Sequence, residues 1–153
     1  MELSIIFLPL IASIISGFFG KYIGDRNSEI VTSALVSISA LLSIFVLYQV
    51  IVNQYEENIV IATWISSGSL DVNWSMLIDP LSAVMLVVVT SVSALVHIYS
   101  IGYMSHDPHK PRFMAYLSLF TFAMLMLVTS DNFIQLFFGW EGVGLCSYFL
   151  IGF

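Results

Sequence analysis

Between Asn132 and Phe153 the sequence contains one charged residue, Glu141, among apolar, small and aromatic residues. The run of 22 residues is long enough to cross a hydrocarbon core of ~30 Å. At ~1.5 Å per helical residue, Glu141 lies near the middle of the membrane. An ionised carboxylate costs at least ~2.5–3.5 kcal/mol there, and loss of hydration favours the protonated form. We therefore predict a carboxyl group that takes up and releases a proton. The alternative is a neutral carboxyl used in helix packing.

His97 is the second group suited to proton transfer, because imidazole titrates near neutral pH. A polar stripe surrounds it, with members at steps of three, four and three that place them on one helix face. The stripe consists of Thr90, Ser93, His97 and Ser100. A polar face in a membrane helix must meet other helices or water rather than lipid. His97 is therefore a candidate proton relay, and the alternative is a histidine hydrogen-bonded to serines of a neighbouring helix.

Three glycines lie close to Glu141: Gly139, Gly142 and Gly144. Small residues either let a neighbouring helix pack closely or let water approach. The sequence leaves both alternatives open. Cys146, the one cysteine, is interpreted as a small packing residue.

Other kinds of site are not predicted. The stretch His106–His109 offers too few donors for a metal and places a proline between them, so we interpret it as a solvated loop. No glycine-rich phosphate loop, cysteine cluster or nucleophile–base pair is found. We expect no metal and no cofactor bound by this chain. The four basic residues form no patch, which argues against a nucleic-acid partner.

The composition is that of an integral membrane protein. Of the 153 residues, 59% are hydrophobic and only 9% are charged, whereas soluble domains carry about 25% charged residues. A single cysteine excludes a disulfide within the chain, and the N-terminus lacks the pattern of a cleaved signal peptide. A soluble enzyme is thereby excluded, and the lipid bilayer is the first expected partner.

Five apolar runs must hold these residues. We predict a single all-α membrane domain with helices at about 3–19, 30–52, 80–103, 113–129 and 132–153. Asp79 and Pro80 have the types expected of an N-cap and a first helical residue. Asp131 or Asn132 is expected to cap the fifth helix.

The segment between the second and third runs is too polar to span a membrane. Leu70 to Met76 alternates strictly between apolar and polar residues, which is the period of a strand. A serine- and glycine-containing turn signal precedes it. We predict a β-hairpin over about 59–76 at the membrane surface, with Trp64 and Trp74 as interfacial anchors. The alternative is an irregular loop.

The basic residues predict the orientation. Lys21 and Arg26 follow the first run, Lys110 and Arg112 precede the fourth, and the hairpin segment has neither lysine nor arginine. By the positive-inside rule, the basic loops face the cytoplasm or the matrix. The N-terminus and the hairpin are therefore expected outside.

Three stretches resemble a known family closely. They are residues 79–82 (DPLS), 96–104 (VHIYSIGYM) and 139–152 (GWEGVGLCSYFLIG). Together they resemble subunit L of respiratory complex I, the proton-pumping NADH:quinone oxidoreductase, and the resemblance extends over the whole chain. Sister antiporter-like subunits and multisubunit sodium/proton antiporters share the Trp140–Glu141 pair, but the continuation through Cys146 is similar to subunit L.

The resemblance implies that Glu141 is the fifth-helix glutamate of a proton half-channel. It also implies a longer subunit, in which a lysine on a later, broken helix pairs with this glutamate, whereas the sequence stops at Phe153. We therefore expect an N-terminal part of a subunit of this translocase, incomplete alone. Its implied partners are the rest of that subunit and other membrane-arm subunits. Partner subunits would carry NAD, flavin, iron–sulfur clusters and quinone, so the chain would have no redox site of its own.

Two other functions stay open. The first is a structural membrane fragment that packs but moves no protons. The second is a subunit of a multisubunit sodium/proton antiporter, which the context of Cys146 disfavours. Either location, a bacterial inner membrane or a mitochondrial inner membrane, agrees with the sequence.

Overall fold

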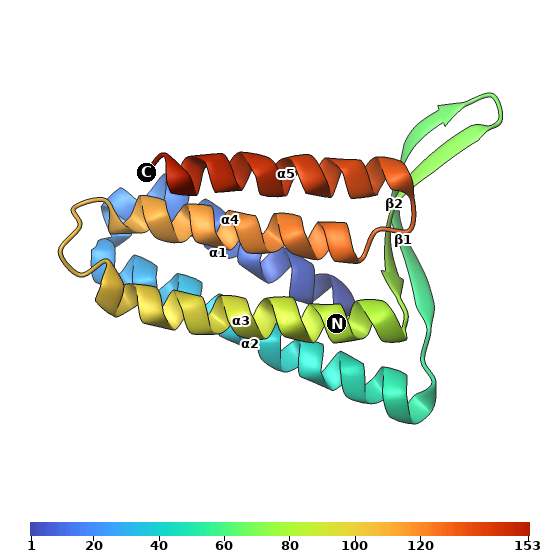
Figure 1. Cartoon of the computed structure of the whole chain (residues 1–153), viewed down its shortest axis with the longest axis horizontal. Helices are drawn as coiled ribbons and strands as arrows, with labels where there is room; N and C mark the ends of the chain where they lie inside the picture. The colour runs from blue at the N-terminus through green and yellow to red at the C-terminus, as the bar shows by residue number, and fades with distance from the viewer.

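The computed structural model describes all 153 residues. The helices are α1 (Glu2–Ile23), α2 (Asp25–Asn53), α3 (Pro80–Tyr103), α4 (Lys110–Val128) and α5 (Phe133–Ile151), and the strands are β1 (Glu57–Ser67) and β2 (Leu70–Ile78). All five helices are long and apolar enough to cross a membrane. Successive helices run in alternating directions along the long axis of the molecule, and the hairpin lies across one end of the bundle (Figure 1). The predicted all-α membrane fold with a hairpin between the second and third helices is confirmed.

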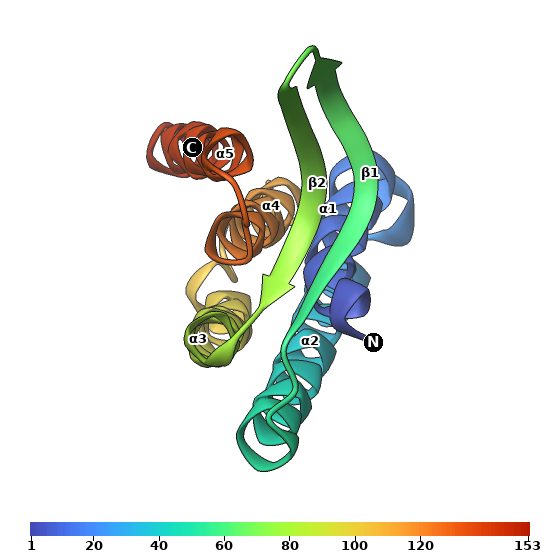
Figure 2. The ribbon, with the colours of Figure 1, turned by 90° about the vertical axis from the view of Figure 1, so that its right-hand side faces the viewer.

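The helices do not share their contacts equally. α1 packs against both α2 and α4, and α2 also packs against α3. α5 packs mainly on α4 and lies at the edge of the bundle (Figure 2). One face of α5 is therefore covered, and most of its remaining surface is exposed.

A hydrophobic core occupies the end of the bundle that carries the hairpin. It combines buried side chains of four helices with Met76 and Ile78 from β2. The helical members are Ile5, Ile6, Val46, Val50, Ala83, Leu86, Leu125 and Met126. The second strand is therefore part of the core, not a loose surface loop.

The connection between the first two helices is shorter than the sequence analysis expected. We expected the second helix to begin at about residue 30 after a polar loop, but α1 continues to Ile23 and α2 starts at Asp25. Gly24 alone makes the turn, with a φ of 87° that favours glycine. Hydropathy marks where a chain enters the membrane, and polar residues at that depth can remain helical. For the same reason α4 starts at Lys110, with a proline in its first turn.

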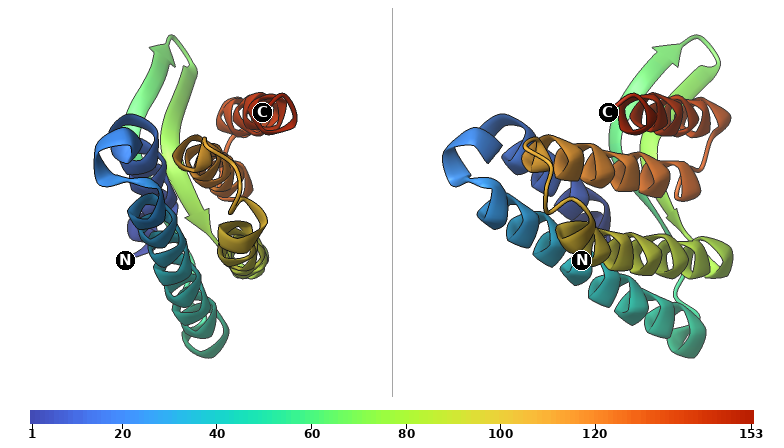
Figure 3. Two further views of the ribbon diagram at one scale, coloured as in Figure 1. Left: turned by 90° about the vertical axis from the view of Figure 1, so that its left-hand side faces the viewer. Right: turned by 60° about the vertical axis from the view of Figure 1, so that its left-hand side comes forward.

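The hairpin has a two-residue turn. Ser67 pairs with Leu70, and Gly68 has a φ of 62°, as the tight turns of hairpins require at this position. Two register shifts interrupt β1, and such bulges increase the twist of a strand. The tip of the hairpin projects past the helices (Figure 3).

The start of α3 is capped as predicted. The Asp79 carboxylate accepts a hydrogen bond of 2.6 Å from the N–H of Ser82. In return the Ser82 hydroxyl accepts one of 2.8 Å from the N–H of Asp79. This reciprocal cap, followed by Pro80, fixes the residue at which α3 begins. It thereby sets the position of the polar stripe along the helix.

Candidate functional site

His97 lies in the interior, between α3 and α4. Its side chain is fully buried, with 0% exposure. Its Nδ1 lies 2.7 Å from the carbonyl oxygen of Ser93, and its Nε2 lies 3.0 Å from the hydroxyl oxygen of Ser118 on α4. A carbonyl only accepts, so Nδ1 carries the hydrogen of the neutral ring and Nε2 accepts from Ser118. His97 is therefore held by its own helix through Nδ1 and bonded to α4 through Nε2.

The polar stripe around His97 faces protein, as predicted. Thr90 and Ser100 are buried with His97. The Thr90 hydroxyl lies 2.7 Å from that of Ser43 on α2. One turn further along α3, the Ser93 hydroxyl lies 2.5 Å from that of Thr121 on α4. The stripe thus ties α3 to α2 at one level and to α4 at the next.

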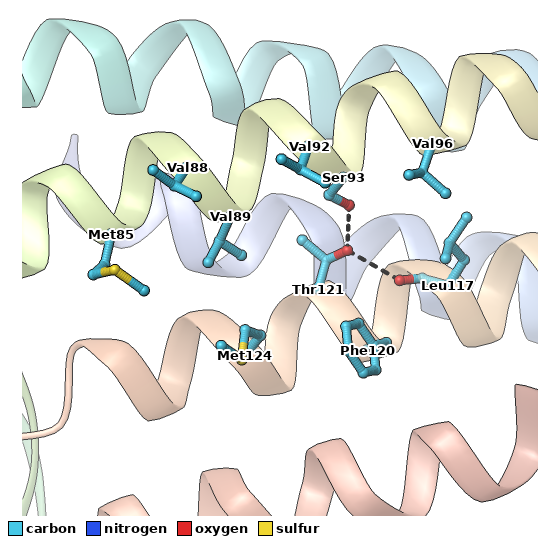
Figure 4. Close-up of a pocket in the computed structure, with 10 residues that line it drawn as sticks. All are labelled: Met85, Val88, Val89, Val92, Ser93, Val96, Leu117, Phe120, Thr121 and Met124. Carbon is cyan, nitrogen blue, oxygen red and sulfur yellow. Dashed lines mark hydrogen bonds between the residues drawn. The ribbon is translucent and has the colours of Figure 1, made fainter.

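A groove of about 380 Å³ runs between α3 and α4 (Figure 4). Its walls are apolar except for Ser93 and Thr121, and the hydrogen bond between these two hydroxyls crosses it (Figure 4). Ser93 also accepts the hydrogen bond from His97 through its main chain. His97 therefore does not line the groove itself but contacts Ser93, which does.

Glu141 has the opposite environment. It lies eight residues after the start of α5 and ten before its end, so it is near the middle of this span. It is exposed and makes no hydrogen bond or ion pair within the chain. The structure does not bring Glu141 and His97 together, because His97 points into the α3–α4 contact and Glu141 lies on the uncovered side of α5.

The glycines near Glu141 separate into two groups. A Cβ added to Gly139 would lie 2.8 Å from the Cα of Leu127, and one added to Gly142 would lie 3.1 Å from the Cβ of Ala123. These two glycines let α5 pack closely on α4. A Cβ on Gly144 would meet nothing within 4 Å. Close packing thus accounts for Gly139 and Gly142, whereas Gly144 packs against no part of this chain.

Sequence comparison then places the chain in a family. Residues 64–114 match the family model described as NADH-ubiquinone oxidoreductase (complex I), chain 5 N-terminus. NADH-ubiquinone oxidoreductase chain 5 of Arabidopsis thaliana is 57% identical over 153 residues, which is 100% of this chain and 23% of that relative. The protein of the same name from Phytophthora infestans is 54% identical over 151 residues, again 23% of its length. The chain belongs to the complex I chain 5 family. It spans about a quarter of the length of these relatives.

In this chain 5 family member, the hairpin contacts the helix that carries Glu141. The ring centroids of Trp64 and Trp74 lie 4.9 Å apart. The Trp74 ring also lies 4.8 Å from that of Phe138, three residues before Glu141. Both tryptophans, which the sequence predicts as interfacial anchors, pack against Phe138 of α5.

Gln135 is a residue of the site that sequence reasoning missed. It is fully buried. Its side chain accepts a hydrogen bond of 3.0 Å from the N–H of Ser75 and donates one of 2.6 Å to the carbonyl of the same residue. Asn132, the observed N-cap of α5, also donates to the main chain of Asn73 in β2. The available signal was that Gln135 is the only amide side chain within α5.

The remaining candidate groups show no arrangement for metal binding. No cluster of three or more histidine, cysteine, aspartate or glutamate side chains is close enough to hold a metal ion. His109 lies 3.9 Å from Asp107 in an exposed loop. Cys146 is buried, in keeping with the packing role expected for it.

Proposed function

We propose that this chain forms part of a membrane-arm subunit of a proton-pumping NADH:quinone oxidoreductase, in which Glu141 takes up and releases a proton within a half-channel. Membership of the chain 5 family supports the assembly. Electron transfer from NADH to quinone takes place in partner subunits, which hold the flavin, the iron–sulfur clusters and the quinone. The partners of this chain are the remaining length of the subunit and other membrane-arm subunits.

The unpartnered carboxyl of Glu141 carries this proposal. A carboxylate exposed to hydrocarbon in the middle of a span is costly and is retained mainly for function. Gly144, one helical turn further on and open on its outer side, allows a neighbouring helix or water to approach the carboxyl. These observations support a proton path and a charge partner of Glu141 on the exposed face of α5, supplied by the rest of the subunit.

His97 is proposed as a second relay, on a separate polar network. Its support is the hydrogen bond from Ser118 on α4 to Nε2 of His97, and the contact of Nδ1 with the main chain of Ser93, which lines the α3–α4 groove. A purely structural role competes with this assignment, because nothing within the chain connects His97 to Glu141. The two residues therefore need separate variants in any functional test.

The orientation is also part of the proposal. Lysine and arginine are confined to the end of the bundle where α1 ends and α4 begins, and the hairpin lies at the other end (Figure 1). This distribution supports an N-terminus and a hairpin on the outer side of the inner membrane.

The deciding experiment replaces Glu141 in the assembled complex. Glu141→Gln keeps the size of the side chain and removes the titrating proton, whereas Glu141→Asp keeps the carboxyl. Assembly on a native gel is expected to be unchanged in both. Proton pumping in proteoliposomes is expected to fall at least about tenfold for the glutamine variant, in keeping with the loss of a proton-transfer group, and less for the aspartate variant.

The matched control is Glu57→Gln, the same change in the exposed hairpin, which is expected to leave pumping intact. Normal pumping by Glu141→Gln would end the relay proposal. His97→Gln, measured in the same way, tests the second relay. Unchanged pumping in that variant would leave His97 with only its packing role.

A further inference from the structure

The basic end of the bundle contains a groove of about 550 Å³ where α1 ends beside the start of α4. The two helices approach closely there. A Cβ added to Gly20 would lie 2.5 Å from the Cβ of Pro111, and the Ser16 hydroxyl donates a hydrogen bond of 2.6 Å to the Pro111 carbonyl. This contact brings Lys21 and Arg112, which are far apart in the sequence, to the walls of one groove.

The charges around this groove are not balanced within the chain. Lys110, which is not a lining residue, lies 3.9 Å from the carboxylate of Glu29. Lys21 and Arg112 form no ion pair. The lining also includes His109 and a single carboxylate, Asp25. The groove therefore presents two unpaired permanent cations and one histidine against one acid.

Arg112 is held in place by its surroundings. Its Nε donates a hydrogen bond of 2.9 Å to the Tyr116 hydroxyl, and its guanidinium lies 5.4 Å from the centre of the Tyr116 ring. The terminal nitrogens make no hydrogen bond within the chain. They remain free for a bidentate contact, the geometry in which guanidinium groups bind phosphate oxygens.

The position of the groove selects the kind of anion. Lys21 and Arg112 lie in the outermost turns of α1 and α4, at the level where a membrane-spanning helix meets the lipid headgroups. Deeper in the same groove, Gly17 and Ala115 continue the lining toward the apolar part of the two helices. A ligand with a phosphate at one end and an acyl chain at the other fits both levels.

We propose that this groove binds the phosphate headgroup of an anionic phospholipid, with Lys21 and Arg112 as the phosphate-binding residues. The first acyl chain then lies along the contact of α1 with α4. Basic residues near a membrane surface each strengthen binding to anionic lipid by about fivefold. Asp25 opposes this attraction.

The test measures lipid retention by native mass spectrometry on the full chain in the membrane assembly from which it is purified. The assembly is titrated with phosphatidylglycerol or phosphatidylcholine. We expect preferential retention of phosphatidylglycerol. The double variant Lys21→Gln, Arg112→Gln is expected to lower it by roughly tenfold or more. Asp25→Asn, which removes the opposing charge, is expected to raise it. Helical circular dichroism confirms that each variant is folded.

Arg26→Gln is the matched control, since Arg26 is an exposed cation at the same end that does not line the groove. If Arg26→Gln lost as much phosphatidylglycerol as the double variant, general surface charge would explain the retention, and the proposed lipid site would be wrong. Unchanged retention in the double variant would also overturn it, as would Asp25→Asn weakening retention. Displacement of the lipid by millimolar inorganic phosphate would show a site for free anions instead. If the double variant does not fold, the other two variants test the proposal. Stronger retention in Asp25→Asn with unchanged retention in Arg26→Gln supports the site, and any other result contradicts it.

Discussion

Gln135 in α5 forms two hydrogen bonds with the main chain of Ser75 in β2, one in each direction. A third strand would make the same pair of bonds. The main-chain N–H of Leu77 is paired in a similar way, with the carbonyl of Thr129 at the end of α4. The edge of β2 is therefore covered by the turn between α4 and α5, and the hairpin is fixed to the helix that carries Glu141.

Replacing Gln135 by leucine is expected to destabilise the fold. The change leaves a buried N–H and a buried carbonyl of Ser75 unpaired, and each such group costs about 1–3 kcal/mol. We expect the free energy of unfolding in detergent to fall by about 2–4 kcal/mol. Denaturant titration followed by tryptophan fluorescence measures it. Gln49→Leu is the control, because Gln49 is only partly buried on α2 and bonds to Asn53 alone. Equal stability of the two variants would contradict this role of Gln135.

Alanine at Gly139 and at Gly144 is expected to have opposite outcomes. At Gly139 the new methyl group would meet the backbone of Leu127 at 2.8–2.9 Å, and overpacking of this kind costs about 1–3 kcal/mol. At Gly144 it would meet nothing within the chain. Thermal unfolding followed by circular dichroism should therefore show a lower melting temperature for Gly139→Ala only. A drop of similar size for Gly144→Ala would show that α5 sits on α4 in a different rotation.

The hydrogen bond from Ser118 to His97 can be tested directly. Ser118→Ala removes the one donor to Nε2 in a fully buried ring, so stability is expected to fall by about 1–3 kcal/mol. The ¹⁵N chemical shift of Nε2 is expected to change, while the shift of Nδ1 remains that of a protonated ring nitrogen. Ser105→Ala is the control, because Ser105 bonds to the exposed ring of His106. A spectrum with Nε2 carrying the proton in the unmodified chain would contradict the assigned tautomer.

Local patterns predicted much of this structure. The spacing of Thr90, His97 and Ser100 placed them on one face, because a helix repeats every 3.6 residues and membrane helices bury their polar sides. Asp79 capped α3 as expected, because the residue types that satisfy the first N–H groups of a helix are few. The alternation from Leu70 to Met76 predicted β2 for a similarly local reason.

Contacts between distant segments could not be predicted in this way. Gln135 and Ser75 are 60 residues apart, and no periodic pattern in the sequence indicates that they form hydrogen bonds with each other. The rotation of α5 about its own axis was equally hidden, since Glu141 and the glycines around it fit either a covered or an open face. The structure resolves this through Gly139, whose missing side chain marks the face that meets α4.

The last prediction concerns the direction in which the bundle crosses the membrane. Ser69 lies in the hairpin turn and His106 in the loop between α3 and α4, and both are exposed at opposite ends of the helices. Cysteines are placed at these positions in turn, in a Cys146→Ala background that removes the one natural thiol.

In right-side-out vesicles, an impermeant maleimide is expected to label Ser69→Cys and to spare His106→Cys, and inverted vesicles should reverse the pattern. The reason is that Lys21, Arg26, Lys110 and Arg112 all lie at the end opposite the hairpin, and lysine and arginine are retained on the inner side. The Cys146→Ala chain without a new cysteine controls for background labelling. Labelling of both positions from one side would contradict an odd number of crossings between them. Labelling of Ser69→Cys in inverted vesicles alone would reverse the orientation, and with it the membrane leaflet to which Lys21 and Arg112 are exposed.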